Sequence, residues 1–279
     1  MTDPIELCLA GILSPHVALS RAILNGVDPN DIIDRLADRS GEPAAELRML
    51  LQRADDLRTL RATAIAGAID HTLQGRQALE MLKTGFDRAV SVSPEASVAA
   101  YSLADPATLA AATIELVAWM TDRSLLQPSY RALDLGCGIG RIAAAIAAMV
   151  QTVIGIDISP AMIAEAQRRY APSTRLRFEV TDGLRLPGDA DSLDLIIAVD
   201  SFPYLVQAGV AESHVADSAR LLRAGGVLTI FNLSYYGLDH DHAAAQAWCN
   251  RFGYQLIDDG ITPFRLWDAA VFLMRKLTD

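Results

Sequence analysis

Three glycines at alternate positions, Gly136, Gly138 and Gly140, have the residue type and spacing that point most directly to chemistry. They follow a short apolar run at residues 132–135 and precede an alanine- and isoleucine-rich run at residues 142–150. A strand, a glycine turn and a helix in this order bring backbone N–H groups and a helix N-terminus close to a ligand. Glycine suits such a turn because a Cβ would block the approach and because the turn needs positive φ. The stretch therefore predicts a ligand-binding turn.

The spacing of these glycines is G-x-G-x-G, whereas dinucleotide-binding domains show G-x-G-x-x-G. Residues 133–141, Leu-Asp-Leu-Gly-Cys-Gly-Ile-Gly-Arg, resemble the first motif of class I S-adenosylmethionine-dependent methyltransferases. The resemblance implies a Rossmann-like α/β domain with S-adenosyl-L-methionine as its cofactor. A glycine turn in another α/β domain, such as a dehydrogenase, is the alternative. The resemblance places these residues of the motif in the cofactor site: Asp134, Gly136, Cys137, Gly138, Gly140 and Arg141.

Asp157 ends the buried strand expected over residues 153–156, about twenty residues beyond the first motif glycine. A carboxylate at this place can accept hydrogen bonds from both ribose hydroxyls of a nucleoside. Residues 156–163 also resemble the second methyltransferase motif, which adds Ile158 and Met162 to the predicted cofactor site. Ser159 is expected to cap the helix that follows. A simple turn at the strand end is the alternative role for Asp157.

Two further aspartates follow the next expected strands, at residues 176–180 and 193–199. The resemblance assigns Asp182, beside Gly183, to the exocyclic amine of adenine, and an ordinary Asp-Gly turn is the alternative. Asp200 and Ser201 should face the methionine part of the cofactor or the acceptor, because ligands of an open α/β sheet bind outside the carboxyl ends of its strands. Residues 200–204 resemble only weakly the Asn-Pro-Pro-Tyr sequence of methyltransferases that act on nucleic-acid amino groups.

Tyr204, His240 and His242 are the candidates for direct action on the acceptor. A neutral imidazole can take a proton from a hydroxyl or an amine near pH 7. Residues 239–242 are too close in sequence to form a metal site alone, so no metal is predicted. The alternative is that both histidines face water just before a helix over residues 243–252, which Asp239 or Asp241 would cap.

The elements that must position these residues divide the sequence into two predicted domains, 1–124 and 125–279. Residues 1–124 show helical patterns, including a long amphipathic helix expected from residue 43 to about 71, and predict a helical accessory or cap domain. From residue 131 onward, strand-like runs alternate with helical stretches, which indicates a parallel sheet covered by helices. The resemblance implies seven strands, with the last antiparallel to the rest and with helices on both faces.

Composition limits the partners and the compartment. The net charge of -10 disfavours a broad nucleic-acid or anionic-membrane surface, and no apolar run is long enough to span a membrane. The acidic N-terminal residues do not predict a secretory signal, and three scattered cysteines fit reduced thiols in the cytoplasm. The helical domain could also hold a homodimer together.

These observations predict an enzyme that transfers a methyl group to an oxygen, nitrogen or sulfur atom of a small-molecule acceptor. Since the sulfonium methyl is already a strong electrophile, alignment for in-line displacement is the main catalytic effect expected. A methyltransferase acting on a protein or nucleic acid, and a non-catalytic protein that binds S-adenosylmethionine, are the alternatives.

Overall fold

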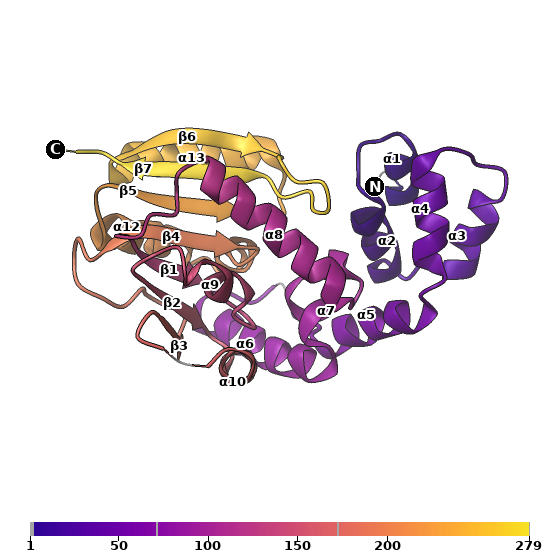
Figure 1. Ribbon diagram of the computed structural model, residues 1–279, viewed down its shortest axis with the longest axis horizontal. Helices are drawn as coiled ribbons and strands as arrows, with labels where there is room; N and C mark the ends of the chain where they lie inside the picture. The colour runs from indigo at the N-terminus through magenta and orange to yellow at the C-terminus, as the bar shows by residue number, and fades with distance from the viewer. Residues whose placement is uncertain (1–2, 71, 172, 279) are drawn as a thin grey trace. The chain divides into compact units, whose positions relative to one another are not determined.

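Seven strands pair in the order β3-β2-β1-β4-β5-β7-β6 in the computed structural model (Figure 1), which describes residues 3–70, 72–171 and 173–278. Strand β7 runs antiparallel to its neighbours β5 and β6, and the other neighbouring pairs are parallel. The predicted mainly parallel sheet with an antiparallel last strand is confirmed. The strands are β1 (Arg131–Leu135), β2 (Thr152–Asp157), β3 (Leu176–Val180), β4 (Leu193–Val199), β5 (Leu222–Phe231), β6 (Tyr254–Ile261) and β7 (Val271–Lys276).

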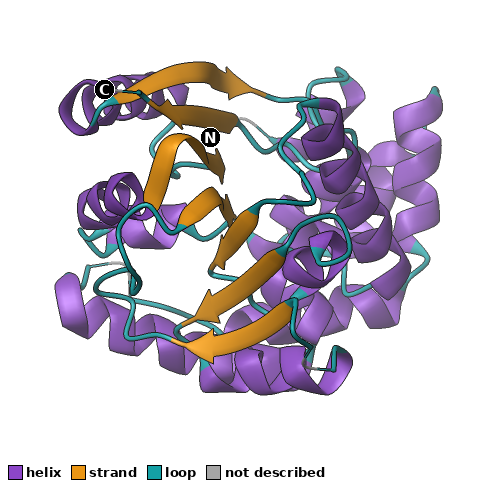
Figure 2. Cartoon of the chain, turned by 60° about the vertical axis from the view of Figure 1, so that its left-hand side comes forward, coloured by secondary structure: helices purple, strands orange, loops and turns teal. Residues whose placement is uncertain are grey.

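Successive side chains of each strand point to opposite faces of the sheet, and buried apolar residues lie on both faces. Helices cover both faces (Figure 2). One face carries Phe231, which packs edge-on against Trp119 of α8, and Asp134, which accepts a hydrogen bond from the backbone of α9. The other face forms a continuous core with α11, α12 and α13. Helix α10 packs along β2 and β3. The helices named here are α8 (Pro106–Asp122), α9 (Arg141–Ile146), α10 (Pro160–Arg169), α11 (Phe202–Gln207), α12 (Ala211–Leu221) and α13 (Leu238–Phe252).

Short helices make up most of the N-terminal part of the chain, and leucine and isoleucine side chains from α1 to α5 form its core. None of the helices in the described ranges is long and apolar enough to cross a bilayer. Their bounds are α1 (Pro4–Leu9), α2 (Pro15–Leu24), α3 (Pro29–Leu36), α4 (Glu42–Leu51), α5 (Ala54–Ala66), α6 (Gly75–Val92), α7 (Pro94–Val98) and the 3-10 helix η1 (Ala100–Ser102).

The prediction of a single long helix from residue 43 to about 71 is wrong, because α4 and α5 are separate helices. Arg53 leaves the helical conformation between them, with ψ 54°. Its guanidinium pairs instead with Asp56 at 2.6 Å and with Asp105 at 3.3 Å. His71, the expected end of the helix, lies outside the described residues.

Compact units divide the chain differently from the predicted boundary at residues 124 and 125. One unit comprises Met1–Ala68, Gly85–Ile114 and Phe264–Asp268, and the other Ile69–Thr84, Glu115–Pro263 and Ala269–Asp279. The sheet unit therefore contains part of α6, and a short segment between β6 and β7 belongs with the helices. The functional division at residue 124 stays a prediction.

Candidate functional site

The glycine turn lies at the carboxyl end of β1, between the ends of β2 and β4. Gly136, Gly138 and Gly140 all have positive φ, at 71°, 51° and 78°. A Cβ on Gly136 would stand 2.4 Å from the Cβ of Ser201, which follows β4 closely in the chain. The Ser201 hydroxyl also donates to the Leu135 carbonyl at 2.6 Å. Glycine is thus required at residue 136 both by φ and by the close approach of β1 and β4.

Asp157, the predicted ribose ligand, is oriented by the backbone on both sides of it. One carboxylate oxygen accepts the Gly138 N–H at 2.9 Å, and the other accepts the Ser159 N–H at 2.9 Å. The carboxylate is therefore fixed in orientation beside the glycine turn. The predicted cap is confirmed, since the Ser159 hydroxyl accepts the Met162 N–H at the start of α10.

The side chains of Asp134, Cys137 and Met162 are all buried, so they support the glycine turn from inside the protein. Asp134 accepts the Ala143 N–H at 3.0 Å and so fixes the first turn of α9. Burial raises the pKa of Asp134 to about 7, although the nearby Arg141 opposes that change. Burial likewise raises the pKa of the Cys137 thiol well above its usual value. Only the backbone of Cys137 is suited to contact a ligand.

Apolar side chains pack closely around Gly183, which follows Asp182 beyond the carboxyl end of β3. A Cβ on Gly183 would stand 2.8 Å from Ile158 Cγ2 and 3.3 Å from Leu79 Cδ2, so these three residues meet. Asp182 accepts the Leu184 N–H through one oxygen, which is the turn geometry that sequence reasoning left open. The Asp182 carboxylate supplies an acceptor that suits an amino group. Leu79 was missed by sequence reasoning, because no local signal links α6 to this edge of the sheet.

Tyr204 and Tyr235 meet near the carboxyl ends of β4 and β5. Their rings pack edge-on at 6.0 Å, and their hydroxyls are hydrogen-bonded. Burial and the Asp200 carboxylate raise the pKa of Tyr204 to about 12. Tyr204 is therefore neutral at physiological pH and suited to donate a hydrogen bond rather than to accept a proton.

His240 and His242 lie in the first turn of α13, which begins at Leu238 and not at the expected residue 243. Successive helical residues turn by about 100°, so residues two apart point to nearly opposite sides. His240 packs edge-on against Tyr236, whereas His242 Nδ1 lies 2.6 Å from Asp259 Oδ1 on β6. The structure does not bring the two histidines together.

Residues 239–242 do not form the cluster considered for a metal, and the described part of the chain holds no group of three or more metal-ligating side chains. The prediction that Asp239 or Asp241 caps α13 is also wrong. The residue at the N-cap of α13 is Gly237, and Asp241 is buried and hydrogen-bonded to Ser234.

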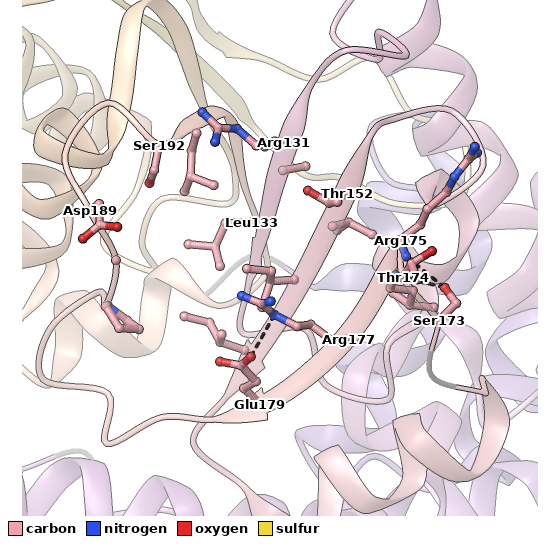
Figure 3. A pocket seen from close by; sticks show the side chains of 18 residues that line it. Arg131, Leu133, Thr152, Ser173, Thr174, Arg175, Arg177, Glu179, Asp189 and Ser192 are labelled. Carbon is pink, nitrogen blue, oxygen red and sulfur yellow. Dashed lines mark hydrogen bonds and ion pairs between the residues drawn. The ribbon is translucent and has the colours of Figure 1, made fainter.

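A cleft of about 560 Å³ runs along β1, β2 and β3 from their amino ends (Figure 3). Arg131 and Leu133 of β1 share its wall with Arg177, which pairs with Glu179 at 2.8 Å. Its lining extends from Arg131 and Thr152 at the amino ends of their strands to Ile156 and Glu179, close to the carboxyl ends of β2 and β3. The lining does not include the glycine turn at residues 136–140.

Comparisons with known proteins agree with this geometry. Residues 132–226 match the family described as "Methyltransferase domain". The chain is 30% identical over 141 residues to "Methyltransferase GfsG" of Streptomyces halstedii, covering 49% of this chain and 50% of that protein. It is 35% identical over 146 residues to "Trans-aconitate 2-methyltransferase" of Deinococcus radiodurans, covering 50% of each. The chain thus spans about half the length of these curated relatives.

A solved structure of Haemonchus contortus phosphoethanolamine N-methyltransferase 1 shares the fold with a TM-score of 0.57. The two sequences are 16% identical, and the match covers 75% of this chain and 51% of that one. Sheet order, glycine turn and family match together define a Rossmann-like methyltransferase domain. Residues 132–226 therefore belong to a domain of the class I S-adenosylmethionine-dependent methyltransferase type, whose cofactor is S-adenosyl-L-methionine.

Proposed function

We propose that this protein transfers the methyl group of S-adenosylmethionine to an oxygen, nitrogen or sulfur atom of a small-molecule acceptor. The observation that carries the proposal is the Asp157 carboxylate, fixed by the N–H groups of Gly138 and Ser159 at the end of β2. A buried carboxylate held beside the glycine turn suits a pair of ribose hydroxyls, because its oxygens accept hydrogen bonds. It adjoins the glycine turn, whose N–H groups are the natural contacts for the rest of the cofactor.

The residues at the carboxyl ends of the strands fit the parts of the cofactor in order from β3 to β4. Asp182, beside Ile158 and Gly183, would hold adenine, Asp157 the ribose, and the turn at residues 136–140 the methionine portion. When bound, S-adenosylmethionine supplies an activated methyl group. The chain's task is then to hold the acceptor atom in line with the methyl carbon and to exclude water.

Tyr204 is proposed to orient the acceptor as a neutral hydrogen-bond donor. Its hydroxyl accepts from Tyr235, which restricts its orientation, and its raised pKa keeps its own proton in place. Tyr235 is itself 55% exposed, so it lies at the rim rather than in the core. The pair gives the acceptor side an amphipathic surface.

A small molecule is the acceptor class that the relatives' names and the charge of the chain support. Trans-aconitate and 2-methyl-6-phytyl-1,4-hydroquinone stand in the names of two relatives. The net charge of -10 disfavours binding to nucleic acid.

The test uses S-adenosylmethionine carrying a labelled methyl group, incubated with the protein and with a whole-cell extract divided by ultrafiltration. The proposal expects protein-dependent label in the small-molecule fraction. Gly138→Val, which blocks the turn, should abolish it. Label confined to protein or nucleic acid would instead identify a macromolecular substrate. Cofactor binding without any transfer of label would identify a non-catalytic binding protein.

A further inference from the structure

The crossover from β3 to β4 leaves part of one sheet face without a helix. Helix α9 connects β1 to β2 and α10 connects β2 to β3, whereas residues 181–192, all of which the structure describes, form no helix. Leu186 of this segment belongs to the core formed with α11, α12 and α13, so the segment runs on the face opposite α9 and α10. Arg220 of α12 donates to the Gly188 carbonyl at 2.6 Å and to the Leu186 carbonyl at 3.0 Å. The segment is thus held against α12 and forms one wall of the cleft along β1, β2 and β3.

Three polar side chains lie side by side where these strands begin. Arg131 lies opposite Thr152 in the register of β1 and β2, and Thr152 lies opposite Arg175, which precedes β3 by one residue. Residues opposite each other in neighbouring parallel strands point to the same face, so the two arginines flank the threonine with their Cα atoms about 10 Å apart. Both arginine side chains are exposed, and Figure 3 shows Thr152 between them.

An apolar floor adjoins this polar row. Two residues further along their strands, Leu133 and Ile154 occupy the same face and line the cleft. Leu133 is buried, and Ile154 is half-buried and packs against the same core. The cleft therefore offers an apolar surface next to a row of hydrogen-bond donors.

The charges of the cleft favour an anion. Among the residues that the structure describes, neither Arg131 nor Arg175 forms an ion pair, whereas Arg177 pairs with Glu179 at 2.8 Å. Asp189 is the other carboxylate of the lining. The lining thus carries three guanidinium groups and two carboxylates, in a chain of 24 basic and 34 acidic residues. This local excess of positive charge attracts anions, and a guanidinium binds a carboxylate or a phosphate through two parallel N–H bonds.

We propose that this cleft is a second binding site, for a small molecule that has an apolar body and a carboxylate or phosphate group. The apolar body lies on Leu133 and Ile154. The anionic group accepts hydrogen bonds from Arg131, Arg175 and the Thr152 hydroxyl. The volume of about 560 Å³ falls within the roughly 300–1,000 Å³ of small-molecule sites. Because the lining leaves out the glycine turn, this site goes beyond the proposed function and does not depend on it.

Fluorescence titration of the full chain with 8-anilinonaphthalene-1-sulfonate tests the site, because this probe has an aromatic body and one anionic group. Replacing both Arg131→Gln and Arg175→Gln keeps two polar side chains and removes their charges. The double variant should bind the probe about tenfold more weakly. Arg275→Gln removes an exposed arginine from β7, which is three strands away from β1, and is the matched control. It should leave the Kd of the probe unchanged.

Competition by three naphthalene derivatives tests the need for an anionic group. The anions 1-naphthoate and 1-naphthyl phosphate should displace the probe, and the more effective of the two identifies the preferred group. Neutral 1-naphthol should displace it about tenfold less effectively. An unchanged Kd in the double variant would overturn the inference, and so would equal displacement by 1-naphthol. Complete displacement of the probe by S-adenosylhomocysteine would also overturn it, since the probe would then occupy the cofactor site.

Discussion

Replacement of Asp157 separates its contribution to the fold from its contribution to ligand binding. Each oxygen of the carboxylate accepts one backbone N–H at 2.9 Å, and the residue is 8% exposed. Asp157→Asn keeps the shape but turns one acceptor into a donor that faces an N–H group. Losing one hydrogen bond to a charged acceptor costs about 1.5–3 kcal/mol, so the free energy of unfolding should fall by that amount.

The same substitution removes an acceptor from one of the two ribose hydroxyls. Binding of S-adenosylhomocysteine should weaken by about 1–3 kcal/mol, which is roughly 5- to 150-fold in Kd. Urea unfolding measures the first effect, and calorimetry below the unfolding transition measures the second. Asp189→Asn, in the loop beside the amino-end cleft, is the control and should change neither quantity. An unchanged Kd in folded Asp157→Asn would refute the assignment of the ribose to this carboxylate.

Four further substitutions, with Gly225→Ala as a control for one of them, test the turn and the acceptor side. The pKa of Asp134 is raised from 3.8 to about 7 by burial, so its contribution to stability is full below pH 4 and is lost as pH rises through 7. The free energy of unfolding of the wild-type protein should therefore fall between pH 5 and pH 8, and that of Asp134→Asn should fall less. At pH 8 the free energy of unfolding of the variant should exceed that of the wild type by about 2–4 kcal/mol. Gly136→Ala puts a Cβ 2.4 Å from a neighbouring side chain and should lower the free energy of unfolding by about 2–4 kcal/mol. Gly225→Ala is the control, because φ is also positive there but the space is open, and it should cost about 1 kcal/mol. His240→Ala and His242→Ala should each keep kcat within about threefold of wild type once an acceptor is known, whereas a 10²–10⁴-fold loss would identify a general base.

Local patterns predicted the parts of the site that depend on local chemistry. The glycine turn, the aspartate at the end of β2 and the Ser159 cap all involve residues close in sequence, and their backbone conformations follow from residue type. The sheet was predicted for the same reason, since each buried strand shows as an apolar run. The cap at Asp105 is equally local, since its carboxylate accepts N–H groups at the start of α8.

Contacts between distant segments account for what the sequence did not predict. The break between α4 and α5 coincides with the pairing of Arg53 with Asp105, 52 residues away. Leu79 lies at Gly183, and Asn232 at Asp200, only because the fold brings these distant segments together. The early start of α13 follows the same rule, since its first turn is secured by a contact from His242 to β6.

The position of His242 explains why proton removal need not involve it. Its ring packs on Phe272 of β7 and its Nδ1 is held by Asp259 of β6, whereas the predicted methyl end of the cofactor lies at β4. β5 lies between β4 and β7, so two strand spacings separate them, which is about 10 Å. Direct proton transfer needs heavy atoms within about 3 Å, and a reacting atom over β4 is well outside that range from His242. We therefore expect alignment to supply the rate, with the acceptor's proton released to water or already absent when the acceptor binds.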